Sequence, residues 1–283
     1  MSRSIVIVFD CLPAHWLGCY GNFDVESPAF DWLATQSVVF DRHIATSPGE
    51  SELAALLTGR YQKLDSAVSI PPGTPPDQIG KTLAKTETDV VWLWMDTSPN
   101  SPATDDDGAE SYHDQVDECD EILTESLEQI EAAGWRDALL IVTAACGDRG
   151  DEDEGQFTDL RLPLLIRHPQ VAGFRLQSIT QPIDLYPTLN EWSGNTPPDE
   201  IDGASLLPLI KGESDGIRDR GFFNNRTHVG IVDDDFILTQ DRNENSQPQL
   251  FLQPHDRWMI HDVAVEYPDV VDELKAVMDA RSL

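Results

Sequence analysis

A chain of 283 residues with 40% hydrophobic side chains can bury a full core, and its composition does not indicate disorder. Its 51 acidic and 19 basic residues give a formal charge of −32. Phosphate-rich surfaces repel such a chain, so we expect no nucleic-acid or anionic-membrane partner. The charge fits a solvated acidic surface, and a protein partner or a homo-oligomer stays open.

The N-terminal segment "SIVIVFD" is a β-branched run that ends in Asp10 and predicts a buried parallel strand. The run is too short for a signal peptide and no small-residue cleavage site follows it. No stretch approaches the roughly 20 apolar residues that a membrane span needs. The four cysteines are scattered along the chain rather than laid out as a disulfide framework, so we expect a cytoplasmic location.

Predicted helices and strands then alternate. Ser27 is a plausible N-cap, with Pro28 at the first helical position. The expected elements are a helix over 27–37, a strand over 38–46, a helix over 50–59, a loop over 63–76, a strand over 89–96, an amphipathic helix over 112–133 and a strand over 138–148. This alternation favours a mostly parallel central sheet with helices on both faces and sites at the carboxyl ends of its strands.

The remaining elements are a strand over 161–169, a helix over 184–194, a short helix within 202–213, an antiparallel meander over 226–257 and a closing helix over 267–282. We therefore predict an α/β domain over residues 1–221 and a small C-terminal domain over 222–283, made of an antiparallel sheet and the closing helix.

The stretch "TSPGESELAALLTGRY", residues 46–61, has the pattern of a loop that enters a helix. Helix N-termini hold anions, because free backbone N–H groups and the helix dipole favour negative charge there. A catalytic loop of this kind usually carries a nucleophile, and this one offers Gly49 and Ser51.

Eight stretches in order resemble the sulfatase family of the alkaline phosphatase superfamily, over about residues 4 to 280. They are "IVIVFDCLPAHWLGCYGN", "SPAFDWLATQSVVFDRHIA", "AALLTGRY", "DEILTESLEQIEAAGWRDALLIVTAACGD", "RLPLLIRHP", "PIDLYPTLNEWSG", "DGASLLPLIKGE" and "LFLQPHDRWMIHDVAVEYPDVVDELK". The resemblance implies an alkaline-phosphatase-like α/β fold and sulfuric ester hydrolysis.

Sulfatases use a formylglycine made from Cys or Ser in a Cys/Ser-x-Pro-x-Arg loop. Counting back from Thr58, the nucleophile position falls on Gly49 and the motif arginine on Leu53. Gly49 has no side chain to oxidise. Ser51 lies nearby, but a serine without the arginine and the metal is a weak nucleophile. The resemblance therefore implies a degenerate nucleophile loop.

The family's calcium ligands are two consecutive acids after the first strand and an Asp followed by Asn or His after the later one. The matching positions here are Asp10 with Cys11 and Ala145 with Cys146. Calcium takes six to eight oxygen ligands and a thiol is a poor one, so we expect calcium binding to be lost. The loop that follows has no lysine and would repel an anionic substrate, with Asp148, Asp151, Glu152, Asp153 and Glu154.

The resemblance also implies that Cys11 and Cys146 lie close together beside Asp10. Three readings stay open. The two sulfurs could bind a soft ion such as zinc, with His15 or Asp148 as a further ligand. They could form a disulfide under oxidant, or fill the space of the lost ion as small buried residues.

Our hypothesis is a catalytically inactive sulfatase-like homologue with a binding or assembly role and no confident cofactor. The alternative is an active ester hydrolase with a rebuilt metal site at Asp10, Cys11 and Cys146. A purely structural role in a larger acidic assembly is a third possibility.

Overall fold

The computed structural model describes residues 2–46, 68–70, 74, 76–86, 88–95, 108–147, 160–196, 201–224, 228–242, 246–256 and 259–281, with side chains left out for 68–70, 76–77 and 108–111. The predicted helix over 50–59, with Gly49, Ser51 and Leu53 of the nucleophile loop, lies outside these residues. Asp148 and the acids that follow it also lie outside them.

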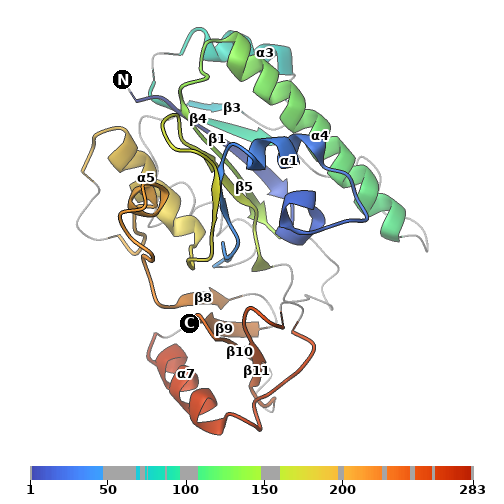
Figure 1. The fold of residues 1–283 in the computed structure, drawn as a ribbon, viewed down its shortest axis with the longest axis vertical. Helices are drawn as coiled ribbons and strands as arrows, with labels where there is room; N and C mark the ends of the chain where they lie inside the picture. Colours follow the sequence, from blue (N-terminus) through green and yellow to red (C-terminus); the bar gives the residue numbers. More distant parts are fainter. Residues whose placement is uncertain are drawn as a thin grey trace.

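A sheet forms the centre of the molecule (Figure 1). It has seven strands, in the order β3-β4-β1-β5-β6-β2-β7. Its strands are β1 (Ser4–Cys11), β2 (Val38–Phe40), β3 (Val68–Ile70), β4 (Val90–Met95), β5 (Leu139–Cys146), β6 (Leu164–Arg167) and β7 (Phe174–Leu176). All neighbours pair in parallel except β6, which is antiparallel to both β5 and β2. The predicted mostly parallel sheet is confirmed.

Helices cover both faces of this sheet, as its continuously buried central strands require (Figure 1). Alternate side chains of β1 point to opposite faces: Ile5 and Ile7 pack with one helical layer, Val6 and Val8 with the other. The first layer consists of α1 (Pro28–Ala34), α3 (Pro76–Leu83) and α4 (Gly108–Ala132), and the second of α5 (Leu185–Trp192) and α6 (Leu207–Ile210).

The expected loop over 63–76 is wrong in part, because β3 lies within it and pairs in parallel with β4. Helix α3, which begins at Pro76, was also not predicted. Three residues of an edge strand are too few to show a period, and the surrounding Pro, Ser and Gly residues favour a loop. Pairing with β4 therefore determines the extended conformation of β3.

The N-cap predicted at Ser27 makes no capping bond with its side chain, whose hydroxyl oxygen accepts from Gly18 N at 2.9 Å. Asp120 of α4 caps α1 instead, accepting bonds from Ala29 N at 2.9 Å and Phe30 N at 3.2 Å. A carboxylate at a helix N-terminus satisfies free N–H groups and the helix dipole, so this cap joins two helices far apart in the chain.

A second sheet follows in the chain, antiparallel and in the order β11-β10-β9-β8. Its strands are β8 (Gly221–Asn224), β9 (His228–Val232), β10 (Phe236–Asp241) and β11 (Gln249–Leu252), and α7 (Pro268–Ala280) packs against β9 and β10 (Figure 1). The predicted antiparallel C-terminal sheet is confirmed, and it starts at Gly221 rather than near residue 226. The domain boundary at 221/222 stays a prediction.

The two sheets meet around a small apolar cluster that includes Ile44, Ile179 and Phe223. A backbone bond from Asn224 N to Thr46 O at 2.8 Å also joins them. Among the described helices, none is long and apolar enough to cross a membrane.

His43 lies fully buried just after β2, with Nδ1 3.0 Å from the hydroxyl of Thr180. Among the described residues, no partner bonds its Nε2. Burial, and secondly the nearby Arg218 cation, lowers the pKa of His43 from its usual 6.5 to about 3. The ring is therefore neutral in the folded chain at pH values where the unfolded chain protonates it.

We therefore expect His43 to lower the free energy of unfolding as the pH falls. Because the pKa of His43 is lower in the folded chain, the native state binds fewer protons than the unfolded state between about pH 6.5 and 3. The free energy of unfolding therefore decreases as the pH falls through that window, by up to about 1.4 kcal/mol per pH unit. Urea unfolding at pH 7, 6 and 5 should show a smaller loss in His43→Gln than in the wild type. The same change at exposed His255 is the control, and equal losses in all three proteins would contradict the assignment.

Candidate functional site

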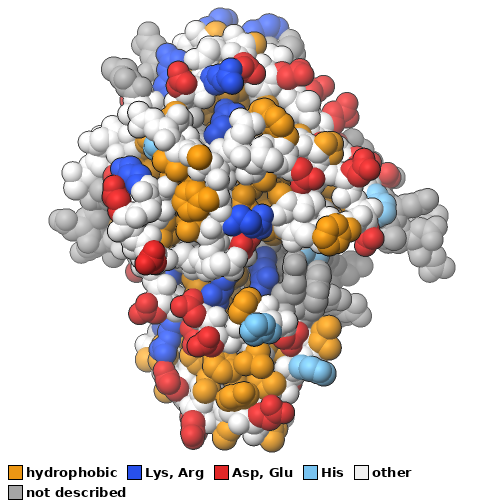
Figure 2. Space-filling model, in the orientation of Figure 1, with side chains coloured by type: hydrophobic (Ala, Val, Ile, Leu, Met, Phe, Trp, Pro, Cys, Tyr) orange, Lys and Arg blue, Asp and Glu red, His pale blue; other side chains and the backbone are white. Residues whose placement is uncertain are grey.

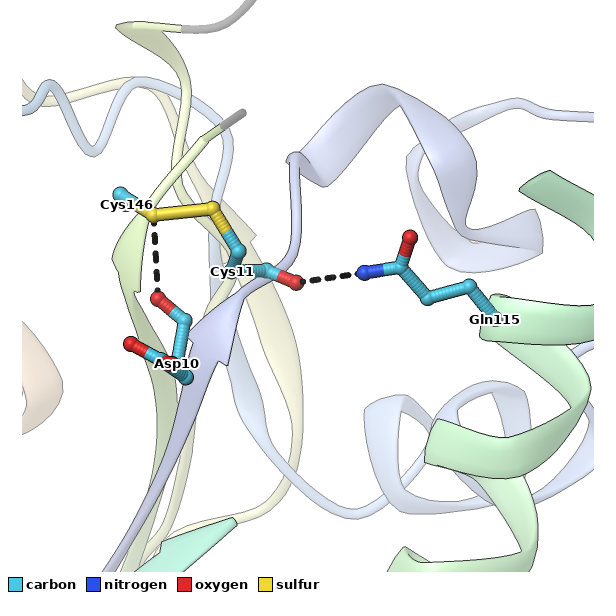
Figure 3. Close-up of a disulfide and its surroundings, with 4 residues drawn as sticks. All are labelled: Asp10, Cys11, Gln115 and Cys146. Atoms are coloured by element: carbon cyan, nitrogen blue, oxygen red, sulfur yellow. Dashed lines mark hydrogen bonds between the residues drawn. A yellow bond between two sulfur atoms is a disulfide. The ribbon is translucent and has the colours of Figure 1, made fainter. Parts of the chain in front are cut away.

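The candidate site lies at the carboxyl ends of β1 and β5, where the sequence predicts it. These strands pair in parallel, and Cys11 lies directly opposite Cys146 in the register. Their Cα atoms are 4.7 Å apart and their sulfurs form a disulfide across 135 residues of chain (Figure 3). Cys11 is 3% exposed and Cys146 8% exposed, so the bridge is largely shielded from solvent.

Backbone groups around the bridge hold the end of β1 in place. Sγ of Cys146 lies 3.1 Å from the carbonyl oxygen of Asp10, and Leu12 N donates to Cys146 O at 3.0 Å. Gln115 of α4 donates from Nε2 to Cys11 O at 3.3 Å (Figure 3). A bridged sulfur has no proton, so the first contact becomes a hydrogen bond only in the reduced thiol. The end of β1 is thus tied to both β5 and α4.

These residues do not fit a calcium ion. Ala145 is buried in the apolar cluster between the sheet and α5, and the sulfurs of Cys11 and Cys146 are bonded to each other. Asp10 then supplies the one side-chain carboxylate among the four matching positions, whereas calcium needs six to eight oxygens. Within the described ranges, no group of three His, Cys, Asp or Glu residues is placed to hold a metal ion.

The zinc hypothesis concerns the reduced chain, because thiolates are the sulfur ligands of zinc and a disulfide has none. Cys11 and Cys146 do come together, as the resemblance implies, and the backbone carbonyl of Asp10 lies beside the Cys146 sulfur. His15 lies on a short helical turn (Ala14–Trp16), where its ring meets that of Trp16 edge-on, with centroids 6.2 Å apart. Zinc binding by the reduced chain stays a prediction.

The two remaining cysteines are poor partners for exchange with the bridge. Burial raises the pKa of the Cys19 thiol to about 12, and it does the same for Cys119. Thiolates are the attacking species in disulfide exchange, so at neutral pH both side chains are almost entirely unreactive. The Cys11–Cys146 bridge is therefore insulated from rearrangement within the described residues.

Three residues near the site were missed from the sequence. Gln115 is partly buried and lies four residues before buried Cys119 on the same face of α4, so the helical period is a signal that could have found it. Trp16 and Tyr112 pack edge to face with centroids 4.4 Å apart. No spacing rule links these two rings, because they come from elements about 90 residues apart.

No family model matches the chain. A multifunctional alkaline phosphatase superfamily protein, PehA of Trinickia caryophylli, is 31% identical over 110 residues, which are 35% of this chain and 21% of that protein. An N-acetylglucosamine-6-O-sulfatase of Bacteroides thetaiotaomicron is 26% identical over 168 residues, which are 52% of this chain and 28% of that protein. The matches thus span less than a third of these curated relatives.

Solved structures match over almost the whole chain. BT4656 in complex with its substrate D-glucosamine-2-N,6-O-disulfate has a TM-score of 0.79 at 15% identity, covering 99% of this chain and 97% of that one. The phosphonate monoester hydrolase of Agrobacterium radiobacter has a TM-score of 0.78 at 16% identity, covering 100% and 96%. Identities this low show the fold alone. The structures therefore show a sulfatase-like fold, and the sequence matches show that parts of the chain are similar to an alkaline phosphatase superfamily protein and a sulfatase.

Proposed function

We propose that this chain is a sulfatase-like protein without ester-hydrolase activity that serves in binding or assembly. The observation that carries the proposal is the Cys11–Cys146 bridge, which occupies two of the four positions where the family resemblance implies metal ligands. Ala145 removes a third ligand, and Gly49 removes the side chain from which the nucleophile would be made. The net charge of −32 also opposes anionic substrates.

An assembly role is supported by apolar side chains near the C-terminal sheet. Ile260 and Val265 between β11 and α7 are 74% and 95% exposed, and Tyr267 beside them is 39% exposed. Figure 2 shows apolar side chains gathered on the lower part of the visible face, where Figure 1 places this sheet and α7. Exposed apolar patches commonly mark protein contacts, so a partner or a second copy of the chain is proposed.

A second candidate function is an ester hydrolase with a rebuilt metal site, which would form only when the bridge is reduced. It is favoured by the closeness of Cys11 and Cys146 at the carboxyl end of the sheet, with the backbone carbonyl of Asp10 beside Cys146. The expected cytoplasmic location would favour the reduced state, since disulfides are rare in the cytosol.

Turnover and metal content separate the two candidates. We expect the purified chain to release no product from an aryl sulfate, an aryl phosphate or a sulfated glucosamine above the buffer rate. Elemental mass spectrometry should find no metal near one equivalent in the bridged protein, and two thiols should react after denaturation without reductant.

Asp10→Ala is the control for activity. Turnover in the wild type that disappears in Asp10→Ala would overturn the non-hydrolytic proposal. About one equivalent of zinc in the reduced protein, absent from a Cys11→Ala/Cys146→Ala variant, would support the rebuilt site. Calcium near one equivalent would contradict the placement of Asp10, Cys11, Ala145 and Cys146.

A further inference from the structure

A pocket lies between α1 and α4, away from the disulfide. Its volume is about 360 Å³, within the range of small-molecule sites. Helix α4 contacts Cys11 through Gln115 near its start, but lines this pocket with its last turns. Arg167 of β6, another lining residue, pairs with Leu140 near the start of β5. The pocket is thus at the opposite end of the sheet from Cys146.

One part of the pocket wall is apolar. Trp32 of α1 is 51% exposed and lies beside Leu127 of α4, which is only partly buried, and beside Ala29 and Pro28. An exposed indole ring supplies a large rigid contact surface with little loss of conformational freedom on binding. Such a wall accommodates a planar ring.

Two arginines line the same pocket, although the chain has only 19 basic residues. Arg136 pairs with Glu131 at 3.1 Å. Within the described part of the chain, the guanidinium of half-buried Arg167 makes no hydrogen bond or ion pair. Burial lowers the pKa of Arg167, the Arg136 cation lowers it further, and Glu131 raises it. A desolvated cation beside a like charge is relieved by a bound anion.

The N-terminus of α1, which also borders the pocket, is already occupied. Asp120 accepts hydrogen bonds from Ala29 N and Phe30 N, so a ligand anion would not find free N–H groups there. Arg167 is therefore the main side chain available to bind an anion, and Arg136 is the second cation. Glu128 and Glu131 on the α4 side disfavour a ligand of higher negative charge, such as a dianionic phosphate monoester.

We propose that this pocket binds a small organic monoanion with a planar ring, its carboxylate or sulfate group held by Arg167 and its ring packed on Trp32. A guanidinium matches either head group with two parallel hydrogen bonds. The site does not depend on the disulfide or on hydrolysis, so it goes beyond the proposed function.

The test is calorimetric titration, with ligand-observed NMR, of four probes. Benzoate and phenyl sulfate carry both the ring and the anion, acetate carries the anion alone, and benzyl alcohol carries the ring alone. We expect at least one ring anion to bind at least tenfold more tightly than acetate and benzyl alcohol. Benzoate alone, phenyl sulfate alone or both would each support the site and identify its head group. Benzoate contains no ester, so its binding is unaffected by any hydrolysis.

Variants assign the contacts. Arg167→Gln should weaken binding of the ring anion at least tenfold, Arg167→Lys should weaken it less, and Trp32→Ala about fivefold. Arg220→Gln, at an arginine paired with Glu273 beside the C-terminal sheet, is the matched control and should bind as the wild type does. Trp32 is half exposed, so its variant is expected to fold even where Arg167→Gln does not.

The outcomes that would overturn the site are also distinct. They are no binding of either ring anion at about 10 mM, benzyl alcohol or acetate binding as tightly as the ring anions, and affinities unchanged in both Arg167→Gln and Trp32→Ala. None of them bears on turnover, and turnover at the other end of the sheet would leave this proposal intact.

Discussion

Removing the Cys11–Cys146 bridge is expected to lower the free energy of unfolding by about 5 kcal/mol at 25 °C. The bridge closes a loop of 135 residues, and closing a long loop restricts the unfolded chain more than the folded one. In the chain-entropy account a loop of about 100 residues contributes about 4.7 kcal/mol, and the dependence on length is logarithmic. A loss of this size is a large fraction of the stability of an ordinary domain.

Urea unfolding of the wild type and of Cys11→Ala/Cys146→Ala, each with and without reductant, measures this effect. Reductant should lower the stability of the wild type and leave the double variant unchanged, which separates the bridge from the packing of two small side chains. A reductant effect below about 1 kcal/mol would contradict the expectation, because the loop would then contribute almost nothing.

Gly203→Ala is expected to destabilise the fold by about 4 kcal/mol or more, or to prevent folding. A Cβ atom at this position would lie 2.0 Å from the carbonyl oxygen of Ile183 and 2.7 Å from its carbonyl carbon. Both atoms belong to the backbone, so no side-chain rotation relieves the overlap. The next residue is anchored as well, because Ala204 N donates to the buried carboxylate of Asp184 at 2.9 Å. Losses of this size come from a short list of causes, and forced overpacking is one of them.

Gly216→Ala is the matched control for this change. Its added Cβ would meet only the hydroxyl oxygen of Ser178, at 3.9 Å, and the residue is exposed. Thermal and urea unfolding of both variants should place Gly216→Ala within about 0.5 kcal/mol of the wild type. A Gly203→Ala variant as stable as the control would show that the segment around Ile183 has room to move.

The sequence predicts the central fold well because its long elements carry strong patterns. The runs that became β1, β4 and β5 are mostly apolar and almost continuously buried, and the stripe of Val116, Cys119 and Leu123 on α4 is buried. The prediction was wrong where another part of the chain decides the local structure. Strand β3 depends on β4, and the cap of α1 depends on Asp120, about 90 residues away.

The candidate site was predicted only in part. The closeness of Cys11 and Cys146 follows once their strands are neighbours in a parallel sheet, and the structure confirms it. Whether their sulfurs pair, bind metal or only pack was left open, because spacing carries no information on the redox state of a thiol. The pocket beside Trp32 and Arg167 has no sequence signal, since three elements and two loops contribute side chains that share no motif.

The Cys11–Cys146 bond also closes part of the chain into a covalent ring, called the circuit below. Every residue from 11 to 146 belongs to it, including the whole of the 46–61 stretch and the helices α1, α3 and α4. A single peptide bond hydrolysed within the circuit opens it without releasing a fragment, so a nicked molecule keeps all its mass and gains one water. The two pieces separate only on reduction. Backbone damage in this half of the protein is therefore invisible to a sizing method run without reductant.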